Sequence, residues 1–206
     1  MSTRTPLVFL ISAPSGAGKT TVGEALLREV PRLRRVITCT TRQPRSGEMQ
    51  GVDYHFLEAQ DFQDRVRSHE FLEHATVYGR SYGTLRSSVL EILDAGMDAL
   101  LIIDVQGAAS VRASAATDMR LSRSLVTVFL TPPTQSELEQ RLRGRASESE
   151  ESLRRRMESA AVEAARWNEF DYLVVSGNRD QDLRRIRSIY ESETMRRDRQ
   201  AFEFGH

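Results

Sequence analysis

A glycine-rich turn near the start of the chain carries the clearest chemical signal in the sequence. Residues 13–20 nearly match the pattern G-x-x-x-x-G-K-[ST], in which successive backbone N–H groups point at the oxygens of a nucleoside triphosphate. An apolar run at residues 7–11 precedes the turn and a helical pattern follows it, so the phosphates would meet the positive end of a helix. The residues expected to bind them are Ala13, Pro14, Ser15, Gly16, Ala17, Gly18, Lys19 and Thr20.

Within this turn, Lys19 is expected to reach the β- and γ-phosphates, and the Thr20 hydroxyl to bind the accompanying Mg²⁺. Lys19 is the single lysine among 29 basic residues, which indicates a position that needs a compact ammonium rather than a planar guanidinium. Ala13 replaces the first glycine of the pattern, and the turn tolerates this only if the φ angle of Ala13 stays negative. The alternative is an incidental glycine turn before a helix.

A second segment is suited to a terminal phosphate. Arg42 and Arg45 flank a proline, which stiffens the loop and limits how far the two side chains can separate. Two guanidinium groups suit the oxygens of a phosphate, and Tyr54 can add a hydroxyl donor. The alternative is a solvated charged loop, which is the usual state of arginines outside helices and strands.

Short apolar runs and apolar residues at helical spacing predict the elements that must position these residues. Strands are expected at residues 7–11, 36–40, 99–103, 125–130 and 172–175, and helices at 19–30, 85–94, 134–144, 148–167 and 180–197. Strands that alternate with helices predict a parallel sheet with helical crossovers. Residues 42–56 interrupt the alternation and are expected to form loops and short strands inserted into the core.

Several segments together resemble the guanylate kinase family. Residues 40–48 read TTRQPRSGE, similar to the family's T-T-R-x-P-R-x-G-E, and residues 51–56 fit G-x-x-Y-x-F. Residues 103–107, IDVQG, resemble I-D-x-Q-G, while FLEHA at 71–75 and YGT at 82–84 fall where the family recognises the base. The resemblance runs from the glycine turn to about Tyr172.

The resemblance implies an α/β fold with three parts. These are a P-loop NTPase core with a parallel β-sheet flanked by helices, an inserted small mixed-β GMP-binding domain, and a helical lid. The expected ranges are 1–37, 87–131 and 158–206 for the core, 38–86 for the insert and 132–157 for the lid. The implied activity is transfer of the γ-phosphate of MgATP to GMP, which gives ADP and GDP.

Base recognition is expected to depend on Glu73. One carboxylate can accept hydrogen bonds from the N1–H and N2 amino groups of guanine together, whereas the unprotonated N1 of adenine would face it lone pair to lone pair. Hydroxyl groups of two threonines can donate to the guanine carbonyl. The alternative for Glu73 is an exposed carboxylate at a helix end. The residues expected to bind GMP are Thr38, Arg42, Arg45, Tyr54, Glu73, Tyr82, Thr84 and Asp104, and Asp104 is also expected to contact Mg²⁺ through water.

Residues 141–151, RLRGRASESEE, resemble the family's lid segment R-L-x-x-R-x-T-E-x-E-E. Arginines on a mobile segment can close over the triphosphate and neutralise the charge of the group being transferred. The resemblance therefore implies catalytic roles for Arg141, Arg145 and Arg156, together with Lys19, Arg42 and Arg45. The other arginines of this region, Arg143, Arg154 and Arg155, are expected to form intrahelical pairs with glutamates.

Two positions depart from the family's pattern. Ile102 stands where the family often has a carboxylate, so Asp104 is expected to act alone near the metal or the GMP phosphate. Ser176 stands where the family tends to have an asparagine, which leaves the contacts to the ATP base open.

Composition limits the remaining possibilities. Hydrophobic residues make up 39% and charged residues 28%, with a formal net charge of zero, as in an ordinary globular protein. Binders of nucleic acid or of membrane surfaces are usually basic, so neither partner is expected. No apolar run is long enough to cross a bilayer, and a cytoplasmic location is expected.

Two other functions fit parts of the pattern. Guanylate-kinase-like domains also occur as protein-binding modules without ATP chemistry, but this sequence contains both the lysine loop and the lid arginines. A P-loop kinase acting on a different small phosphate acceptor is the other alternative. The combination of Glu73 with the segment around Arg42 argues against it.

Overall fold

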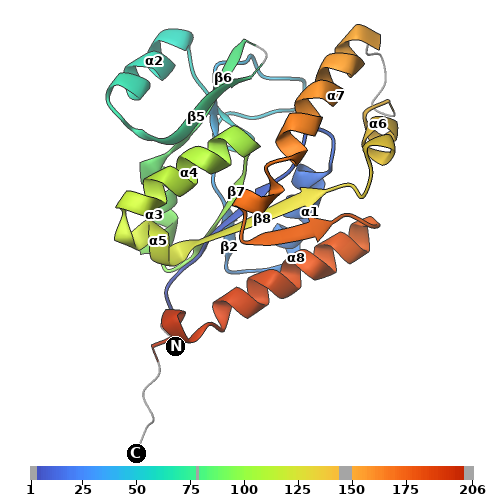
Figure 1. Cartoon of the computed structure of the whole chain (residues 1–206). Coiled ribbons are helices and arrows are strands. Elements are labelled where there is room, and N and C mark those ends of the chain that lie inside the picture. Colours follow the sequence, from blue (N-terminus) through green and yellow to red (C-terminus); the bar gives the residue numbers. More distant parts are fainter. Residues whose placement is uncertain (1–3, 78, 144–149, 202–206) are drawn as a thin grey trace, which may run out of the picture.

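A five-stranded parallel sheet, with strand order β2-β7-β1-β8-β9, forms the centre of the computed structural model (Figure 1). The structure describes residues 4–77, 79–143 and 150–201. Neighbouring strands of this sheet are parallel in every pair. Its strands are β1 (Val8–Ser12), β2 (Leu33–Arg35), β7 (Asp98–Ile102), β8 (Leu125–Thr131) and β9 (Tyr172–Val175).

Helices cover both faces of this sheet, as the burial of the side chains of β1 on both faces shows. Alternate side chains of β1 point to opposite faces, so Phe9 and Ile11 join one core cluster, whereas Val8 and Leu10 join the other. All four are fully buried, which is the reason for the unbroken apolar run in the sequence. One face is covered by α1 (Lys19–Glu29) and α8 (Arg179–Thr194), and the other by α3 (Arg86–Asp94), α4 (Val105–Thr117) and α5 (Met119–Ser124).

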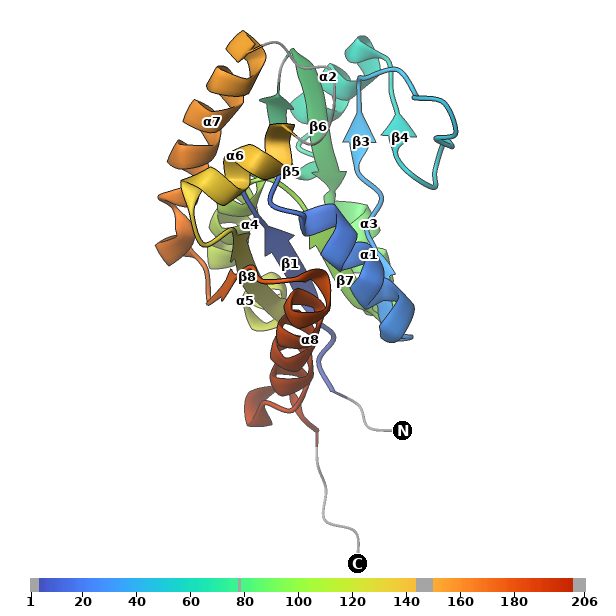
Figure 2. The same cartoon turned by 90° about the vertical axis from the view of Figure 1, so that its right-hand side faces the viewer.

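A second, four-stranded sheet has the order β4-β3-β6-β5 and mixes parallel with antiparallel pairs. Figure 2 shows it beyond the start of α1, with α2 beside it. Its members are β3 (Cys39–Thr40), β4 (His55–Phe56), β5 (Phe71–Val77) and β6 (Arg80–Leu85), and the adjoining helix is α2 (Ala59–Arg67). All four strands lie within residues 38–86.

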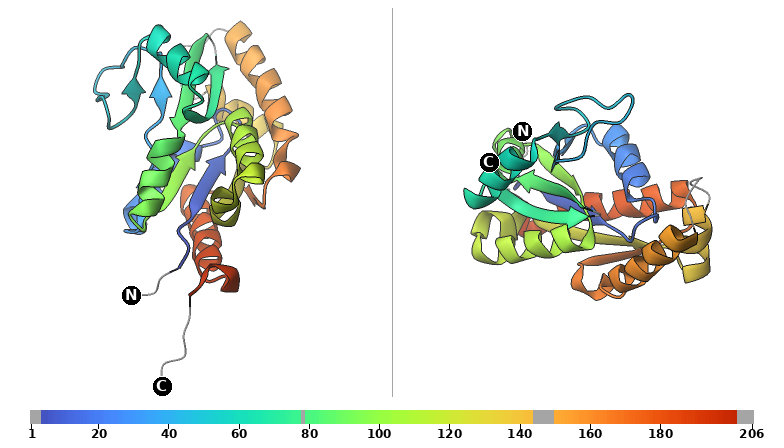
Figure 3. Two further views of the ribbon diagram at one scale, coloured as in Figure 1. Left: turned by 90° about the vertical axis from the view of Figure 1, so that its left-hand side faces the viewer. Right: turned by 90° about the horizontal axis from the view of Figure 1, so that it is seen from above.

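Two helices, α6 (Gln135–Arg143) and α7 (Glu150–Ala164), pack on each other through a small apolar cluster of their own. This cluster consists of Leu138 and Leu142 from α6 and of Leu153 and Ala160 from α7. The core strands finish at one end of the molecule. In the left view of Figure 3, the second sheet and α7 lie at this end, on opposite sides of it. Two short 3₁₀ helices, Trp167–Glu169 and Arg197–Arg199, complete the described chain.

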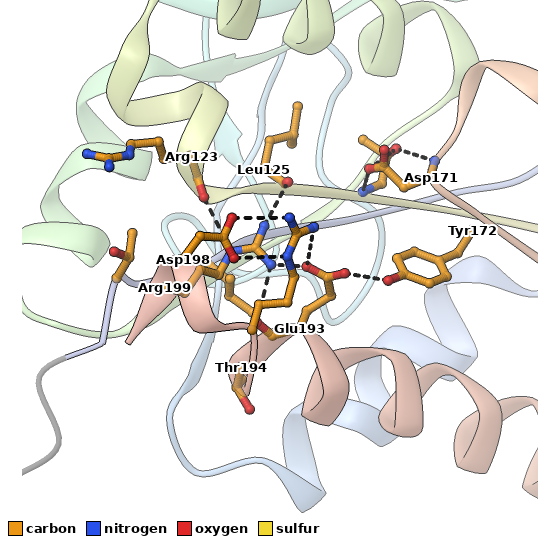
Figure 4. Close-up of polar contacts among 12 residues, drawn as sticks. Arg123, Leu125, Asp171, Tyr172, Glu193, Thr194, Asp198 and Arg199 are labelled. Carbon is orange, nitrogen blue, oxygen red and sulfur yellow. Dashed lines mark hydrogen bonds and ion pairs between the residues drawn. The ribbon is translucent and has the colours of Figure 1, made fainter. Parts of the chain in front are cut away.

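Buried charges hold the opposite end of the core together (Figure 4). Arg199 forms an ion pair with Glu193, and both side chains are about 95% covered. Glu193 also accepts from the Tyr172 hydroxyl, while Arg199 donates to the carbonyl of Leu125 at 3.4 Å. The C-terminal 3₁₀ turn is thereby joined to α8 and to strands β8 and β9.

The structure changes several sequence-based expectations. The strand predicted at residues 36–40 is wrong as a single element, because the chain leaves β2 at Arg35 and enters the other sheet at Cys39. Elements β2, β5, β6, α2, α4 and α5 were not predicted. In strand β5 the neighbouring residues Leu72 and Glu73 are both buried, so the strand lacks the regular alternation that would predict it, and α4 is built largely of small residues. No helix within the described ranges is long and apolar enough to span a membrane.

Candidate active site

The glycine turn joins β1 to α1 as the sequence predicts. Gly16 and Gly18 have φ angles of +90° and +99°, which side chains other than glycine rarely adopt. A Cβ atom on Gly16 would also lie 2.5 Å from Cδ2 of Leu142, so the turn fits closely under α6. Ala13 is fully buried without a positive φ angle, which meets the condition for alanine there.

A cavity of about 610 Å³ lies between this turn, the second sheet and α7. It brings together residues that lie far apart in the sequence. The predicted residues that line it are Ser15, Lys19, Thr20, Thr38, Arg45, Tyr54, Glu73, Tyr82 and Asp104. Their convergence on one cavity is a result of tertiary structure, because the outermost pair, Ser15 and Asp104, lies 89 positions apart in the chain.

Glu73 lies at the end of this cavity that belongs to the second sheet. It sits on strand β5 and is only 4% exposed, so the alternative of an exposed carboxylate at a helix end is wrong. Its Oε1 accepts a hydrogen bond of 2.6 Å from the Thr84 hydroxyl. Burial raises the pKa of Glu73 to about 7, an effect that the nearby charge of Asp104 increases and the Thr84 hydrogen bond opposes.

The helix α4 approaches Glu73 closely at its first turn. A Cβ atom on Gly107 would lie 2.7 Å from Oε2 of Glu73, so glycine at this position makes room for the carboxylate. Asp104 caps the same helix by accepting from the Gly107 N–H at 2.8 Å. Ile102, two residues before Asp104, also lines the cavity and packs against Gly23 of α1.

The arginine loop is held by Glu48. Arg42 donates from both terminal nitrogens to the Glu48 carboxylate, at 2.6 and 2.7 Å, and its guanidinium lies 4.9 Å from the ring centre of Tyr54. The backbone N–H of Arg45 donates to the same carboxylate at 2.8 Å. These bonds lower the pKa of Glu48 to about 2, with the Arg42 bond as the largest cause. Among the described residues that line the cavity, Arg45 is present and Arg42 is not.

Two of the predicted lid arginines contact the phosphate-binding turn. Arg141 donates to the carbonyl of Ala17 at 3.3 Å, and Arg156 donates to the Ser15 hydroxyl at 3.1 Å. Arg145 lies outside the described residues.

The arginines that were expected to form intrahelical pairs do contact glutamates. Arg143 pairs with Glu139 and also bridges to Glu150 on the next helix, whereas Arg154 and Arg155 pair within α7. Arg155 additionally lines the large cavity.

Sequence reasoning missed Glu163. Its Oε2 accepts from the backbone N–H of Ser15 at 3.0 Å, and its Oε1 accepts from the Ser159 hydroxyl at 3.1 Å. Arg156, Ser159 and Glu163 recur at helical spacing on α7, so they share one face of the helix. That spacing was the only signal in the sequence that could have placed Glu163 beside the turn.

The phosphate-binding turn follows a strand of a parallel sheet, and it faces a cavity that ends at a buried carboxylate. Together these features define the class of P-loop nucleoside monophosphate kinases. The family model "Guanylate kinase" matches residues 3–193, and the chain belongs to this family. The chain transfers phosphate from ATP to GMP. This activity excludes both alternatives that the sequence left open, a protein-binding module without ATP chemistry and a kinase for a different phosphate acceptor.

Individual relatives agree with this assignment. The guanylate kinase of Paramagnetospirillum magneticum is 44% identical over 96% of this chain and 89% of its own length. The guanylate kinase of Bradyrhizobium diazoefficiens is 41% identical over 95% of this chain and 87% of its own. The crystal structure of guanylate kinase from Anaplasma phagocytophilum superposes with a TM-score of 0.76 at 28% identity, covering 96% of this chain and 91% of that one.

Proposed function

We propose that the cavity between Lys19 and Glu73 is where the γ-phosphate of MgATP is transferred to GMP. One observation carries this proposal: a buried carboxylate suited to guanine lines the same cavity as the lysine and threonine of the phosphate-binding turn. GMP placed with its base at Glu73 would direct its phosphate toward Lys19. The two reacting groups would then be held together, which is the main requirement for phosphoryl transfer.

In this arrangement Glu73 accepts from the N1–H and N2 amino groups of guanine. Thr38 and Thr84 donate to the guanine carbonyl, for which the Thr84 hydroxyl must turn away from Glu73. Arg42, Arg45, Tyr54 and Tyr82 bind the GMP phosphate. Arg45, Tyr54 and Tyr82 already line the cavity, and Arg42 would exchange its bond to Glu48 for the phosphate or share its nitrogens between the two.

ATP is bound on the turn formed by residues 13–20. Backbone N–H groups contact its phosphate oxygens, and the Lys19 ammonium contacts the β- and γ-phosphates. The Ser15 N–H must exchange its bond to Glu163 for a phosphate oxygen. We further propose a division into a core (1–37, 87–131 and 158–206), a GMP-binding insert (38–86) and a lid (132–157).

The side-chain oxygens of Thr20 and Asp104 fit a magnesium ion. Thr20 is exposed to the cavity and would contact Mg²⁺ directly, while Asp104 would contact it through water. Bound there with the phosphates, the ion neutralises part of their charge. A hydroxyl, one carboxylate and phosphate oxygens are the ligand types that Mg²⁺ uses in kinases.

The transfer is a direct, in-line displacement. The second phosphate pKa of GMP is about 6, so the attacking phosphate is already mostly a dianion at neutral pH and needs no strong base. The protein must instead offset the repulsion between two anions. Lys19 and the lid arginines Arg141, Arg145 and Arg156 would supply this positive charge.

A steady-state assay with ATP as donor and GMP, AMP, CMP or UMP as acceptor tests the proposal. GMP should be the preferred acceptor, and Glu73→Gln should reduce the preference. Comparable rates with AMP in the wild-type enzyme would contradict the role of Glu73. We also propose that the enzyme works in the cytoplasm and without a nucleic-acid partner, as its balanced charge supports.

A further inference from the structure

Glu163 of α7 occupies a backbone donor of the phosphate-binding turn. Its Oε2 accepts from the Ser15 N–H at 3.0 Å, across a separation of 148 positions in the chain. Its Oε1 accepts from the Ser159 hydroxyl at 3.1 Å, one helical turn earlier, so both carboxylate oxygens are held. Glu163 and Ser159 also line the large cavity. A carboxylate of the protein itself therefore lies at a turn that is suited to anions.

A second bond joins α7 to the same residue of the turn. Arg156 donates to the Ser15 hydroxyl at 3.1 Å. Arg156 and Glu163 lie about two helical turns apart on α7, so both reach Ser15 from one face of the helix. The two contacts together fix the position of the Glu163 carboxylate over the turn.

The position of Ser15 indicates which phosphate the carboxylate replaces. Ser15, Lys19 and Thr20 line the cavity that faces the acceptor, whereas Ala17 and Gly18 line a separate, smaller cavity. Because the γ-phosphate must face the acceptor, the Ser15 N–H belongs to the γ-phosphate end of the turn. A backbone N–H is a single donor, and a carboxylate and a phosphate repel each other, so only one of them can occupy it.

We propose that Glu163 discriminates ATP from ADP, because its carboxylate takes the place of the γ-phosphate at the Ser15 N–H. In the empty enzyme and in the ADP complex, the carboxylate keeps this bond. ATP must displace it, so the lost bond weakens the binding of ATP and leaves that of ADP unchanged. After phosphate transfer the carboxylate returns to Ser15. This inference rests on the proposed binding of ATP with its γ-phosphate in the large cavity.

The first test is calorimetric titration of MgATP and MgADP without GMP, so that no phosphate is transferred to an acceptor. Glu163→Gln keeps the size of the side chain but removes its charge, and a neutral amide holds the Ser15 N–H less strongly than a carboxylate does. We expect the Kd for MgATP to fall about fivefold or more, and the Kd for MgADP to change by less than about twofold.

Glu158→Gln is the matched control, because Glu158 is exposed on the same helix and pairs with Arg154. It should leave both dissociation constants unchanged. Weaker or unchanged binding of MgATP to Glu163→Gln, or an equal gain for MgADP, would reduce Glu163 to a structural residue and overturn the inference. Failure of the wild-type enzyme to bind MgATP or to phosphorylate GMP would instead contradict the proposed function, and this inference with it.

The amide resonance of Ser15 in NMR spectra is the second test, and it compares the wild-type enzyme with Glu163→Ala. In the empty enzyme and with MgADP, the two proteins should differ at this amide, because only the wild type has the carboxylate bonded to it. With MgATP the two resonances should coincide, since the γ-phosphate occupies the N–H in both proteins. A difference that persists with MgATP would mean that the carboxylate stays at Ser15, and it would overturn the inference.

Discussion

Glu73 and Thr84 stand opposite each other on the antiparallel strands β5 and β6, and the Thr84 hydroxyl donates to the Glu73 carboxylate at 2.6 Å. Strand pairing therefore sets the distance between the Glu73 carboxylate and the Thr84 hydroxyl, the two groups that are proposed to bind guanine. The same pairing holds Glu73 in a site with almost no exposure to water. Its charge consequently depends on pH within the physiological range.

The use of GMP should fall as pH decreases through about 7. Burial raises the pKa of Glu73 to about 7, and only the carboxylate can accept from both guanine donors. A pH profile of kcat/KM for GMP measures this directly. Glu73→Gln is the control: it should lose about 2–4 kcal/mol in kcat/KM and keep only the pH dependence of the GMP phosphate itself.

The same pKa has a consequence for stability. Because the pKa in the folded protein lies above the ordinary glutamate value of 4.5, the folded protein binds more protons than the unfolded chain between about pH 4.5 and 7. The contribution of Glu73 to the free energy of unfolding therefore decreases as pH rises through this window. Glu73→Gln should lack this decrease, and an identical pH dependence in both proteins would contradict the raised pKa.

Lys19→Arg should reduce kcat by at least roughly a hundredfold, or about 2.7 kcal/mol of transition-state stabilisation. The charge is retained, but a planar guanidinium should not fit a turn shaped around an ammonium. Because Lys19 is the only lysine, an amine-reactive reagent should modify it and the α-amino group alone, and ATP should protect only Lys19. Near-normal turnover of Lys19→Arg would contradict its assignment to the triphosphate.

Glu48→Gln should weaken GMP use by about tenfold in kcat/KM while leaving the KM for ATP unchanged. Glu48 accepts from Arg42 and from the Arg45 backbone, so its charge holds both arginines of the loop. A neutral amide holds a guanidinium less strongly than a carboxylate does. Asp53→Asn is a suitable control on the same loop, since Asp53 contacts Met49 instead. Unchanged GMP kinetics would mean that the loop keeps its shape without the ion pair.

Glu193→Gln should destabilise the protein by about 3–5 kcal/mol, because it leaves Arg199 buried without a countercharge. Thermal unfolding should show a decrease of roughly 10 °C in Tm, with kcat unchanged at temperatures where the variant is folded. Asp64→Asn removes an exposed ion pair to Arg67 and should change stability by less than about 0.5 kcal/mol. Equal effects of the two substitutions would contradict a special role for the buried pair.

Binding of both substrates should compact the protein. Arginines proposed to bind phosphate lie on the insert and on the lid helices, and both parts must approach the core to share one pair of substrates. Small-angle scattering should give a smaller radius of gyration with a bisubstrate analogue than without it. The same radius in both states would argue against closure.

Much of the core could be predicted from the sequence because its signals are local. The strand at β1, the turn with Gly16 and Gly18, and the start of α1 at Lys19 follow from an apolar run, from glycines that adopt positive φ angles, and from helical spacing. The second sheet could not be predicted in the same way. Its strands β3 and β4 contain only two residues each, and β5 and β6 owe their position to pairing with each other.

By itself, the sequence determined the chemical groups of this protein: a single ammonium at Lys19, paired arginines around a proline, and a carboxylate at Glu73. Only the tertiary structure decided what those groups can do. Burial between β6 and α4 gives Glu73 its raised pKa, and the bond to Glu48 orients Arg42 toward the loop rather than the cavity. Solvent exclusion and hydrogen bonding depend on all the elements around a residue, and residue type and spacing along the chain do not encode them.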